Sequence, residues 1–344
     1  MINNIPAYRK AIEIIASEIS ATGGEILVTG ASGLIGSCIV DVLLAANRLN
    51  HKNFSIYAMG RSAEKLKKRF GDLPDVYCIA QNAADPIKIQ GLDYIIHAAS
   101  NADPKSYAIY PVETILTNIE GAQSVLAYCK DHKTRALLTS TFEVYGKMDQ
   151  DEYDEDCSGV IDLNLIRSCY PESKRSAELL FKGYHDEYGV DCVIARLSSI
   201  YGPTMQKNDS KAHAQFLRNA LDGKDIVLKS QGTQKRTYCY VMDAVSGLFT
   251  LLFKGKAGEV YNVANEKSVA TIAEVASVIA NLTGRKIVFD IPDDFESKGF
   301  SKTQNCVLST EKIRSLGWTG KYDLESGIKE TLEILRMIED SPNC

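Results

Sequence analysis

The chain has 344 residues, of which 45% are hydrophobic and 24% are charged, and its formal net charge is −5. This length suits one large α/β unit or two lobes, and the composition is that of a globular protein. The acidic balance excludes a general electrostatic attraction to nucleic acid or to an anionic membrane surface, and no apolar run is long enough to span a bilayer. We therefore expect neither a nucleic-acid nor a membrane partner.

Nine cysteines are scattered along the chain without CxxC pairs or Cys/His clusters of metal-site spacing. This pattern predicts no metal site and no disulfide framework, and it favours free thiols in a reducing, cytoplasmic location. The first twenty residues place Ile12, Ile15, Ala16 and Ile19 on one face. That spacing predicts an amphipathic helix over 7–20, since it lacks the continuous apolar core of a signal peptide.

A glycine-rich segment follows the first apolar run. It reads Ile26-Leu27-Val28-Thr29-Gly30-Ala31-Ser32-Gly33-Leu34-Ile35-Gly36, with three glycines spaced three apart before an amphipathic stretch. Such a strand brings its backbone against a dinucleotide pyrophosphate: Gly30 permits the tight turn, Gly33 the approach to phosphate, and Gly36 close helix packing. The N–H groups at the helix N-terminus then face the anion. The segment therefore predicts a dinucleotide site.

Strand and helix signals alternate through the first half of the chain. Apolar strands separated by helical crossovers indicate a parallel sheet covered on both faces. The predicted strands are 25–29, 54–59, 76–79, 93–97, 135–140 and 191–196. The predicted helices are 34–47, 62–70, 111–132 and 171–188. We expect an α/β fold with a Rossmann-like, doubly wound parallel sheet over 1–199.

The rhythm changes after Ile200. Tyr201-Gly202-Pro203 is turn chemistry, and 204–211 is polar. Shorter elements follow, predicted as helices at 212–222, 243–254, 271–283 and 323–338 and strands at 226–229 and 235–241. We expect 200–344 to form mainly a smaller, mixed α/β lobe that binds substrate, with the chain crossing between the two lobes more than once.

Tyr170 and Lys174 are four residues apart in a predicted helix, so their side chains share a face. An ammonium beside a tyrosine favours the phenolate and lowers its pKa, so Tyr170 can take a hydroxyl proton while hydride leaves the same carbon for a nicotinamide. Thr141 and Glu143 follow strand 135–140, at the sheet edge where doubly wound folds build their sites. We expect Thr141 to hydrogen-bond the sugar hydroxyl. Glu143 fits a catalytic or a solvated loop position equally well.

Taken together, these residues resemble the extended short-chain dehydrogenase/reductases of the NAD-dependent epimerase/dehydratase family, which modify nucleotide sugars. Within that family the chain looks most similar to UDP-glucuronate decarboxylases and dTDP-glucose 4,6-dehydratases. The resemblance covers nearly the whole chain. It is carried by 29–36, 97–100, 111–114, 118–121, 140–146, 167–175, 196–203 and 235–243.

The resemblance implies roles for the matching residues. Tyr170 would be the base, Lys174 its partner and a ribose ligand, Thr141 the third member, and Glu143 the glutamate that handles the C5 proton in dehydratases. The implied cofactor contacts, beside Tyr170 and Lys174, are Gly30, Ser32, Gly33, Leu34, Ile35, Gly36, Arg61, Ser62, Asn82, Ala98, Ala99, Ser100 and Asn118. The implied contacts to a nucleotide-diphosphate sugar are Arg167, Ser199, Lys211 and Arg236, the last of which matches an arginine that grips the diphosphate.

Three positions depart from the pattern. Phe142 stands where the dehydratases place an aspartate that protonates the leaving C6 hydroxyl, which argues against 4,6-dehydration. Ser199 replaces an expected asparagine. Lys211 takes the place of an arginine in the decarboxylases, and an ammonium cannot reproduce a bidentate fork to a carboxylate. If a uronate carboxylate is bound, Arg167 and Lys211 are the candidate cations.

The second strand leaves the choice of dinucleotide open. NAD enzymes commonly end this strand with an acid for the ribose hydroxyls, whereas here Arg61 and Ser62 follow it. These two residues suit a 2′-phosphate, and the alternatives are that Arg61 stacks on the adenine or caps the next helix. Asn82 lies where the family often has an aspartate near the adenine. NAD is the family expectation and NADP its competitor.

The leading functional hypothesis is a nucleotide-sugar enzyme that oxidises C4 with bound NAD(P) and acts as an epimerase without net redox change. Tyr170, Lys174 and Thr141 suffice for that reaction. The alternative is a UDP-glucuronate-type decarboxylase. Arg61 motivates an NADPH-dependent keto-sugar reductase, and retention of the Tyr/Lys pair disfavours a non-catalytic dinucleotide sensor. The resemblance also implies a homodimer formed through helices 111–132 and 171–188.

Overall fold

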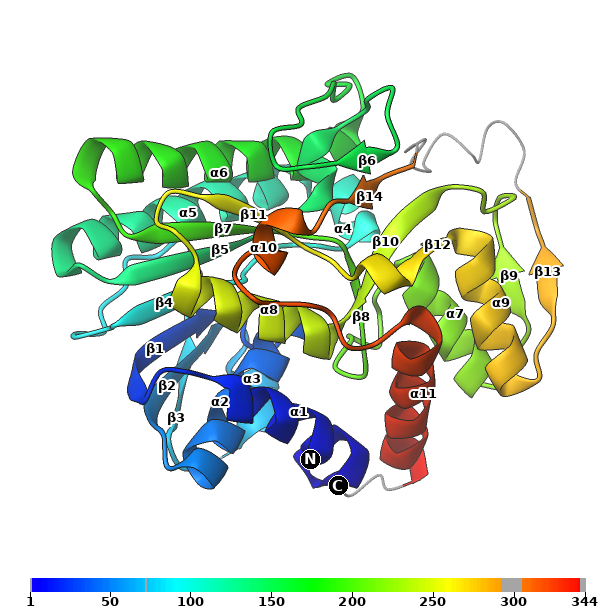
Figure 1. Ribbon diagram of the computed structural model, residues 1–344, viewed down its shortest axis with the longest axis horizontal. Coiled ribbons are helices and arrows are strands. Elements are labelled where there is room, and N and C mark those ends of the chain that lie inside the picture. The colour runs from blue at the N-terminus through cyan, green and yellow to red at the C-terminus, as the bar shows by residue number, and fades with distance from the viewer. Residues whose placement is uncertain (1, 72, 292–304, 341–344) are drawn as a thin grey trace.

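A sheet of seven parallel strands forms the centre of the molecule (Figure 1). The computed structural model describes residues 2–71, 73–291 and 305–340. In spatial order the strands are β11 (Val260–Val263), β7 (Cys192–Leu197), β5 (Arg135–Thr141), β4 (Tyr94–His97), β1 (Gly23–Thr29), β2 (Asn53–Gly60) and β3 (Val76–Ala80). The order reverses direction at β1, as in a doubly wound fold. The predicted Rossmann-like α/β class is confirmed.

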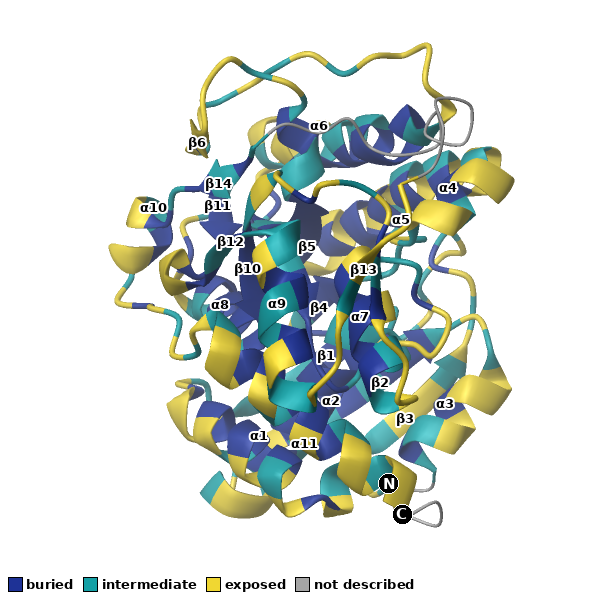
Figure 2. Ribbon diagram, turned by 90° about the vertical axis from the view of Figure 1, so that its right-hand side faces the viewer, coloured by how far each residue is buried: buried dark blue, intermediate teal, exposed yellow. Residues whose placement is uncertain are grey.

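Alternate residues of each strand feed two separate apolar cores. Ile26 and Val28 of β1 belong to one core, and Leu27 between them belongs to the other. Helices α2 (Leu34–Asn50), α3 (Ala63–Phe70) and α8 (Val241–Lys254) cover the first face, and α5 (Pro111–His132) and α6 (Cys169–Tyr188) cover the second. Both faces of the inner strands are therefore buried (Figure 2), which explains their continuous apolar sequences, whereas the edge strand β3 has exposed residues such as Tyr77.

The amphipathic segment at the N-terminus forms helix α1 (Pro6–Glu18). Its buried side chains include Tyr8, Ile12 and Ile15, and it packs on α2 and α8 as an outer layer. The Tyr8 hydroxyl donates a 2.6 Å hydrogen bond to the buried carboxylate of Asp41 on α2. This hydrogen bond fixes α1 against α2.

A second group of elements lies beside the carboxyl ends of the central strands (Figure 1). It contains a three-stranded sheet of β8 (Ser199–Tyr201), β10 (Lys235–Tyr240) and β12 (Val269–Thr271), and the pair β9 (Ile226–Leu228) and β13 (Ile287–Phe289). Helices α7 (Ala212–Leu221), α9 (Ile272–Thr283) and α11 (Leu324–Asp340) pack with these strands. The smaller elements are α4 (Pro104–Ile109), α10 (Glu311–Arg314), β6 (Glu152–Tyr153) and β14 (Val307–Leu308).

The sequence missed one strand of the central sheet. β11 is only four residues long and pairs in parallel with β7, which brings the chain back to the first sheet after it has built β8 and β10. α8 precedes it and packs against β5 and β7. None of the helices in the described ranges is both long and apolar enough to cross a membrane.

Candidate active site

The turn after β1 has a backbone that only glycine can form. Gly30 has a φ of 68°, and a Cβ there would lie 2.6 Å from the carbonyl oxygen of Ala98. A Cβ at Gly36 would lie 2.4 Å from the carbonyl oxygen of Gly30, so α2 could not approach the turn so closely. Within the described chain, no side chain caps the N-terminus of α2. A glycine turn leading into an uncapped helix N-terminus fits a dinucleotide pyrophosphate.

A chain of hydrogen bonds links the predicted cofactor residues after β4 to helix α6. Residues 98–100 follow β4 directly, next to the glycine turn. Ser100 donates a 2.8 Å hydrogen bond to Asn118 of α5, and Asn118 in turn donates 2.9 Å to Ser173 of α6. Ser173 precedes Lys174, so this chain ties the loop after β4 to the helix that carries the predicted base.

Arg61, Ser62 and Asn82 lie at the carboxyl ends of β2 and β3. The Ser62 hydroxyl accepts from the backbone N–H of Lys65 at 3.2 Å and so caps α3. Arg61 donates to the side-chain oxygen of Asn101 at 3.1 Å, and Asn82 is exposed. The helix cap that was one alternative for Arg61 is therefore made by its neighbour.

The loop that follows Tyr201-Gly202-Pro203 is held on the glycine turn. Gln206 donates a 2.7 Å hydrogen bond to the Ser32 carbonyl, and Thr204 donates 2.7 Å to the Leu34 carbonyl. Both donors belong to the loop that leads toward α7, whereas both acceptors surround Gly33. The loop that begins the substrate side is thus hydrogen-bonded to the predicted dinucleotide loop.

Tyr170, Lys174 and Thr141 meet where β5 ends beside the start of α6. Tyr170 is only 6% exposed and stacks on Tyr107 of α4, with ring centroids 4.6 Å apart and an interplanar angle of 13°. Lys174 donates through Nζ to the carbonyl oxygen of Thr139 at 2.9 Å. Thr141 is the last residue of β5, and its hydroxyl accepts from the backbone N–H of Glu143 at 3.3 Å.

Burial controls the charge of Tyr170 in this structure. It raises the pKa of the phenol well above its usual value, and the Glu143 carboxylate raises that pKa further. Hydrogen bonds with Thr141 and Tyr107 act in the opposite direction but do not outweigh burial. The sequence predicted a tyrosine pKa lowered by Lys174, and the structure gives the reverse, because the site excludes the water that would stabilise a phenolate.

The same burial acts on Lys174. It lowers the pKa of the ammonium to about 8, and the Glu178 carboxylate opposes that shift. Lys174 therefore loses its proton at a much lower pH than an exposed lysine. The sequence analysis did not identify Glu178. Its spacing of four residues from Lys174 places it on the same face of α6, and this spacing can be read from the sequence.

Glu143 and Arg167 form an ion pair next to Tyr170. The Arg167 guanidinium lies 2.8 Å from the Glu143 carboxylate, and the two side chains are 28% and 21% exposed. The charges of both act on the pKa of Tyr170. Arg167 is the middle residue of a short 3₁₀ turn, Ile166–Ser168, that leads into α6. The Arg167 guanidinium thus lies beside the predicted base and is partly exposed, so that a ligand can reach it.

Lys211, the other candidate cation, is directed elsewhere. Its ammonium lies 3.2 Å from the Asp209 carboxylate, two residues away in the loop before α7. Asp209 is itself buried, and the backbone N–H of Lys211 also donates to it at 3.0 Å. The two predicted cations therefore have different carboxylate partners, and Arg167 is the one whose charge acts on Tyr170.

Arg236 on β10 points toward the end of β5. Its guanidinium lies 5.6 Å from the centroid of the Phe142 ring. Its Nε atom is buried and has no hydrogen-bond partner in the described part of the chain. Ser199 of β8 pairs with Tyr238 of the same strand β10, which brings two of the predicted substrate residues to one small sheet. A buried guanidinium N–H without an acceptor fits an anionic ligand such as a diphosphate.

The family model of the NAD dependent epimerase/dehydratase family matches residues 26–264. This chain belongs to the NAD-dependent epimerase/dehydratase family. UDP-glucuronic acid decarboxylase 6 of Arabidopsis thaliana is 35% identical over 320 residues, which cover 91% of this chain and 89% of that protein. The family member described here is accordingly an enzyme of the epimerase, dehydratase and decarboxylase class that acts on nucleotide sugars.

Solved structures support the same assignment. A dTDP-glucose 4,6-dehydratase from Streptomyces venezuelae, crystallised with NAD and TYD bound, has 25% identity and a TM-score of 0.78, covering 92% of this chain and 98% of that one. A UDP-glucuronic acid 4-epimerase from Bacillus cereus, in complex with UDP-glucuronic acid and NAD, has a TM-score of 0.77 at 22% identity and covers 91% and 99%. At that lower identity the similarity establishes the fold alone.

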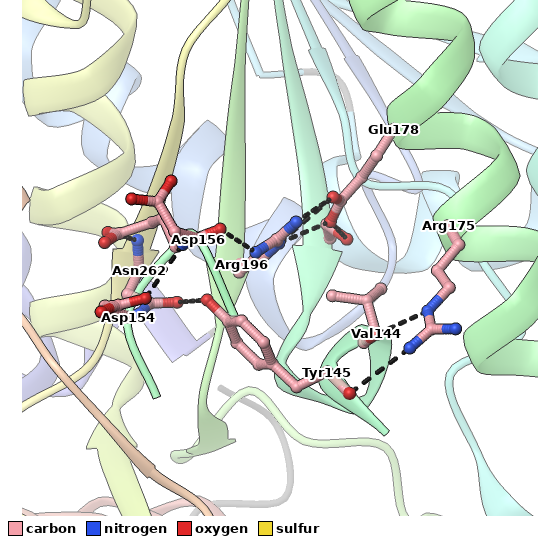
Figure 3. A network of polar contacts seen from close by, with 10 residues as sticks. Val144, Tyr145, Asp154, Asp156, Arg175, Glu178, Arg196 and Asn262 are labelled. Carbon is pink, nitrogen blue, oxygen red and sulfur yellow. Dashed lines mark hydrogen bonds and ion pairs between the residues drawn. The ribbon is translucent and has the colours of Figure 1, made fainter. Parts of the chain in front are cut away.

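In this family member, a polar network fixes the segment that follows β5 (Figure 3). Arg196 of β7 pairs with Glu178 of α6 at 2.8 Å, and its guanidinium lies 4.7 Å from the centroid of the Tyr145 ring. Tyr145 donates a 2.7 Å hydrogen bond to Asn262 of β11, and Arg175 of α6 donates 2.6 Å to the Val144 carbonyl. The network therefore holds the turn that carries Glu143 against β7, β11 and α6.

Tyr107 is the other site residue that the sequence analysis missed. It stacks on Tyr170, but it lies on the short helix α4, which no periodic pattern predicted. Over residues 2–71, 73–291 and 305–340, no group of three or more His, Cys, Asp or Glu side chains is arranged to hold a metal ion.

Proposed function

We propose that the enzyme decarboxylates a nucleotide-diphosphate uronic acid, with UDP-glucuronate as the leading substrate. The observation that carries this proposal is the Arg167–Glu143 pair beside Tyr170, which offers a guanidinium to a sugar carboxylate. The decarboxylase relatives favour the same reaction over the epimerase that the sequence placed first. A 4-epimerase of a neutral sugar would present no carboxylate to Arg167, whereas an epimerase of a uronate, such as the Bacillus cereus enzyme, would, so the product formed distinguishes the two reactions.

The residues can be assigned to the steps of such a reaction. Tyr170 would take the proton of the C4 hydroxyl, and Thr141 and Lys174 would position that hydroxyl and the ribose. Because burial raises the pKa of Tyr170 in this structure, the positive charge of a bound nicotinamide would have to lower that pKa for Tyr170 to act as the base. NAD, held by the glycine turn and Lys174, would supply the hydride acceptor for C4 and the hydride that is returned. The C4 ketone makes the uronate a β-keto acid, so the C5–C6 bond breaks, carbon dioxide leaves, and its electron pair becomes an enolate at C4–C5.

Two charged residues act on that bond. Arg167 can hold the carboxylate through two parallel N–H donors, a geometry that the ammonium of Lys211 cannot offer. The carboxylate of the substrate would then replace Glu143 at the guanidinium. Glu143, released as a carboxylate, would take a proton from water and pass it to C5, while the Tyr170 hydroxyl would hydrogen-bond to the enolate oxygen.

We propose NAD as the cofactor rather than NADP. The Ser62 hydroxyl is already used as the cap of α3, and Arg61 already donates to Asn101. Titration calorimetry is expected to give a dissociation constant for NAD at least about tenfold below that for NADP. Tighter binding of NADP, weakened by Arg61→Ala, would instead support the reductase alternative.

Purified enzyme incubated with UDP-glucuronate tests the reaction itself. The expected product, identified by mass spectrometry, is a UDP-pentose lighter by one carbon dioxide. Arg167→Gln is expected to lower carbon dioxide release by about 100-fold, since one partner of a bidentate pair is lost. Arg48→Gln, which removes an exposed guanidinium paired with Glu13, is the matched control and is expected to keep full activity. Formation of the C4 epimer with its carboxylate retained would contradict the proposal.

A further inference from the structure

His213 lies in the first turn of α7, where three substrate-side segments converge. It is 8% exposed, and its imidazole meets the ring of Tyr238 edge-on, with centroids 6.1 Å apart and an angle of 89°. The centroid of the Tyr201 ring lies 6.4 Å from that of the imidazole. The imidazole also hydrogen-bonds the backbone of Ile200. A histidine is thus enclosed between β8, β10 and the start of α7.

The charged groups that face His213 are mainly positive. Lys211 precedes it by two residues, and Arg236 lies on β10 two residues before Tyr238. Among the main influences on His213 the acidic one is Asp209, which already pairs with Lys211. Arg218, one turn further along α7, donates to the backbone carbonyl of Asp209 and adds another cation.

This environment keeps the imidazole neutral. Burial lowers the pKa of His213, and the cations Lys211 and Arg236 lower it further, whereas Asp209 raises it. Arg236 has a buried Nε without a partner among the described residues, so its guanidinium is left available to an anion. A diphosphate bound to Arg236 would bring negative charge close to His213. That negative charge would raise the pKa of the imidazole.

We propose that His213 is a proton-linked positioning residue of the diphosphate site, which takes up a proton as the nucleotide sugar binds next to Arg236. The inference rests on the nucleotide-diphosphate part of the proposed function and not on decarboxylation. The proton adds a positive charge beside the diphosphate only in the complex. Binding therefore tightens as the pH falls, by at most about tenfold per pH unit for one linked proton.

Calorimetry with UDP-glucose tests this on the wild-type enzyme, because the diphosphate of that ligand does not titrate near neutral pH. Titrations at about pH 6 in two buffers of different ionisation enthalpy give the protons taken up per site. We expect a net uptake of at least about 0.3 proton, and affinity tighter by at least about threefold at pH 5.5 than at pH 7.5. Zero uptake would overturn the inference while leaving the nucleotide-sugar proposal intact. No detectable binding of UDP-glucose would overturn both.

His213→Gln identifies the group. Glutamine keeps a side-chain donor for Ile200 but cannot take a proton, so the uptake and the pH dependence of affinity should vanish. His51→Asn is the matched control: His51 is exposed at the end of α2 with a φ of 50°, which asparagine tolerates, and this variant should keep the wild-type uptake. Uptake that persists in His213→Gln would assign the proton to another group. Should that variant fold poorly, the imidazole resonances of the wild-type enzyme, titrated with and without UDP-glucose, report the same pKa change.

Discussion

Burial of the charged Lys174 ammonium lowers the free energy of unfolding of the protein. Its pKa falls from 10.5 to about 8 on folding because the ammonium is buried, with a single hydrogen bond to the Thr139 carbonyl. Between those two pH values the unfolded chain binds more protons than the folded one, so this group makes the fold more stable as the pH rises through that window. Below about pH 8 the full cost remains, on the order of 3 kcal/mol.

Lys174→Met should therefore stabilise the protein while abolishing turnover. Methionine fills the same space without a charge, and after the loss of one hydrogen bond we expect a gain of about 1–2 kcal/mol in the free energy of unfolding at pH 7. Thermal melts at that pH measure it, with the exposed Lys182→Met as the control. A lower melting temperature for Lys174→Met would show that the buried ammonium is net stabilising.

At this scale the sequence predicted which side chains meet but not their charge states. The i, i+4 spacing of Tyr170 and Lys174 is a property of the helix, so it could be read directly. Their pKa values depend on what covers them, and Tyr107 reaches Tyr170 from a helix of six residues that lies far earlier in the chain. Burial of this kind is set by tertiary packing and leaves no local pattern.

We expect dinucleotide binding to depend on the contact between α2 and the glycine turn. Gly36→Ala would place a methyl group 2.4 Å from the Gly30 carbonyl oxygen, so helix and turn must separate. We expect a loss of about 1–3 kcal/mol in stability and a reduction of NAD affinity by tenfold or more. Calorimetry and urea unfolding measure the two effects.

Gly183→Ala is the control for that change, since nothing lies within 4 Å of a Cβ built at Gly183 in α6. It should leave NAD affinity unchanged and add up to about 1 kcal/mol of helix stability. If Gly36→Ala bound NAD as tightly as the wild type, the glycine turn would not be the pyrophosphate site.

Whole elements were predictable where the pattern was long. The helix at 111–132 agrees with α5, and those at 34–47 and 171–188 agree with α2 and α6 to within one turn. α4 was missed because a helix of six residues carries too little periodicity. β11 was missed although β4, of the same length, was predicted, because β11 lies in the part of the chain that was assigned to the substrate lobe. The pairing of β11 with β7 also depends on the path of the chain through the substrate side, which a local reading cannot follow.

The outer surface of α5 and α6 bears on how the whole molecule assembles. The two helices lie side by side over the sheet (Figure 1), and they expose Val112, Leu116 and Leu179 at 60%, 45% and 69%. We propose that a second copy of the chain covers this face and forms a homodimer. Leu179→Asp should then shift the enzyme to a monomer in light scattering after gel filtration, because a charge would be buried in the interface.

Met337→Asp is the matched control, because Met337 is also exposed but belongs to α11, a helix that lies away from α5 and α6 (Figure 1). That variant should stay dimeric. A wild-type enzyme that is monomeric at all accessible concentrations would rule out the proposed assembly, without affecting the assignment of the active site.

The central claim is that the enzyme removes the carboxylate of a nucleotide uronate without net consumption of NAD. Carbon-13 NMR of UDP-glucuronate labelled at C6 tests it most directly, recorded while the absorbance of NADH is followed in the same sample. The account predicts that the label passes completely into carbon dioxide and bicarbonate, while NADH does not accumulate in proportion to product. A label that stays on the sugar, with only the C4 configuration changed, would contradict it.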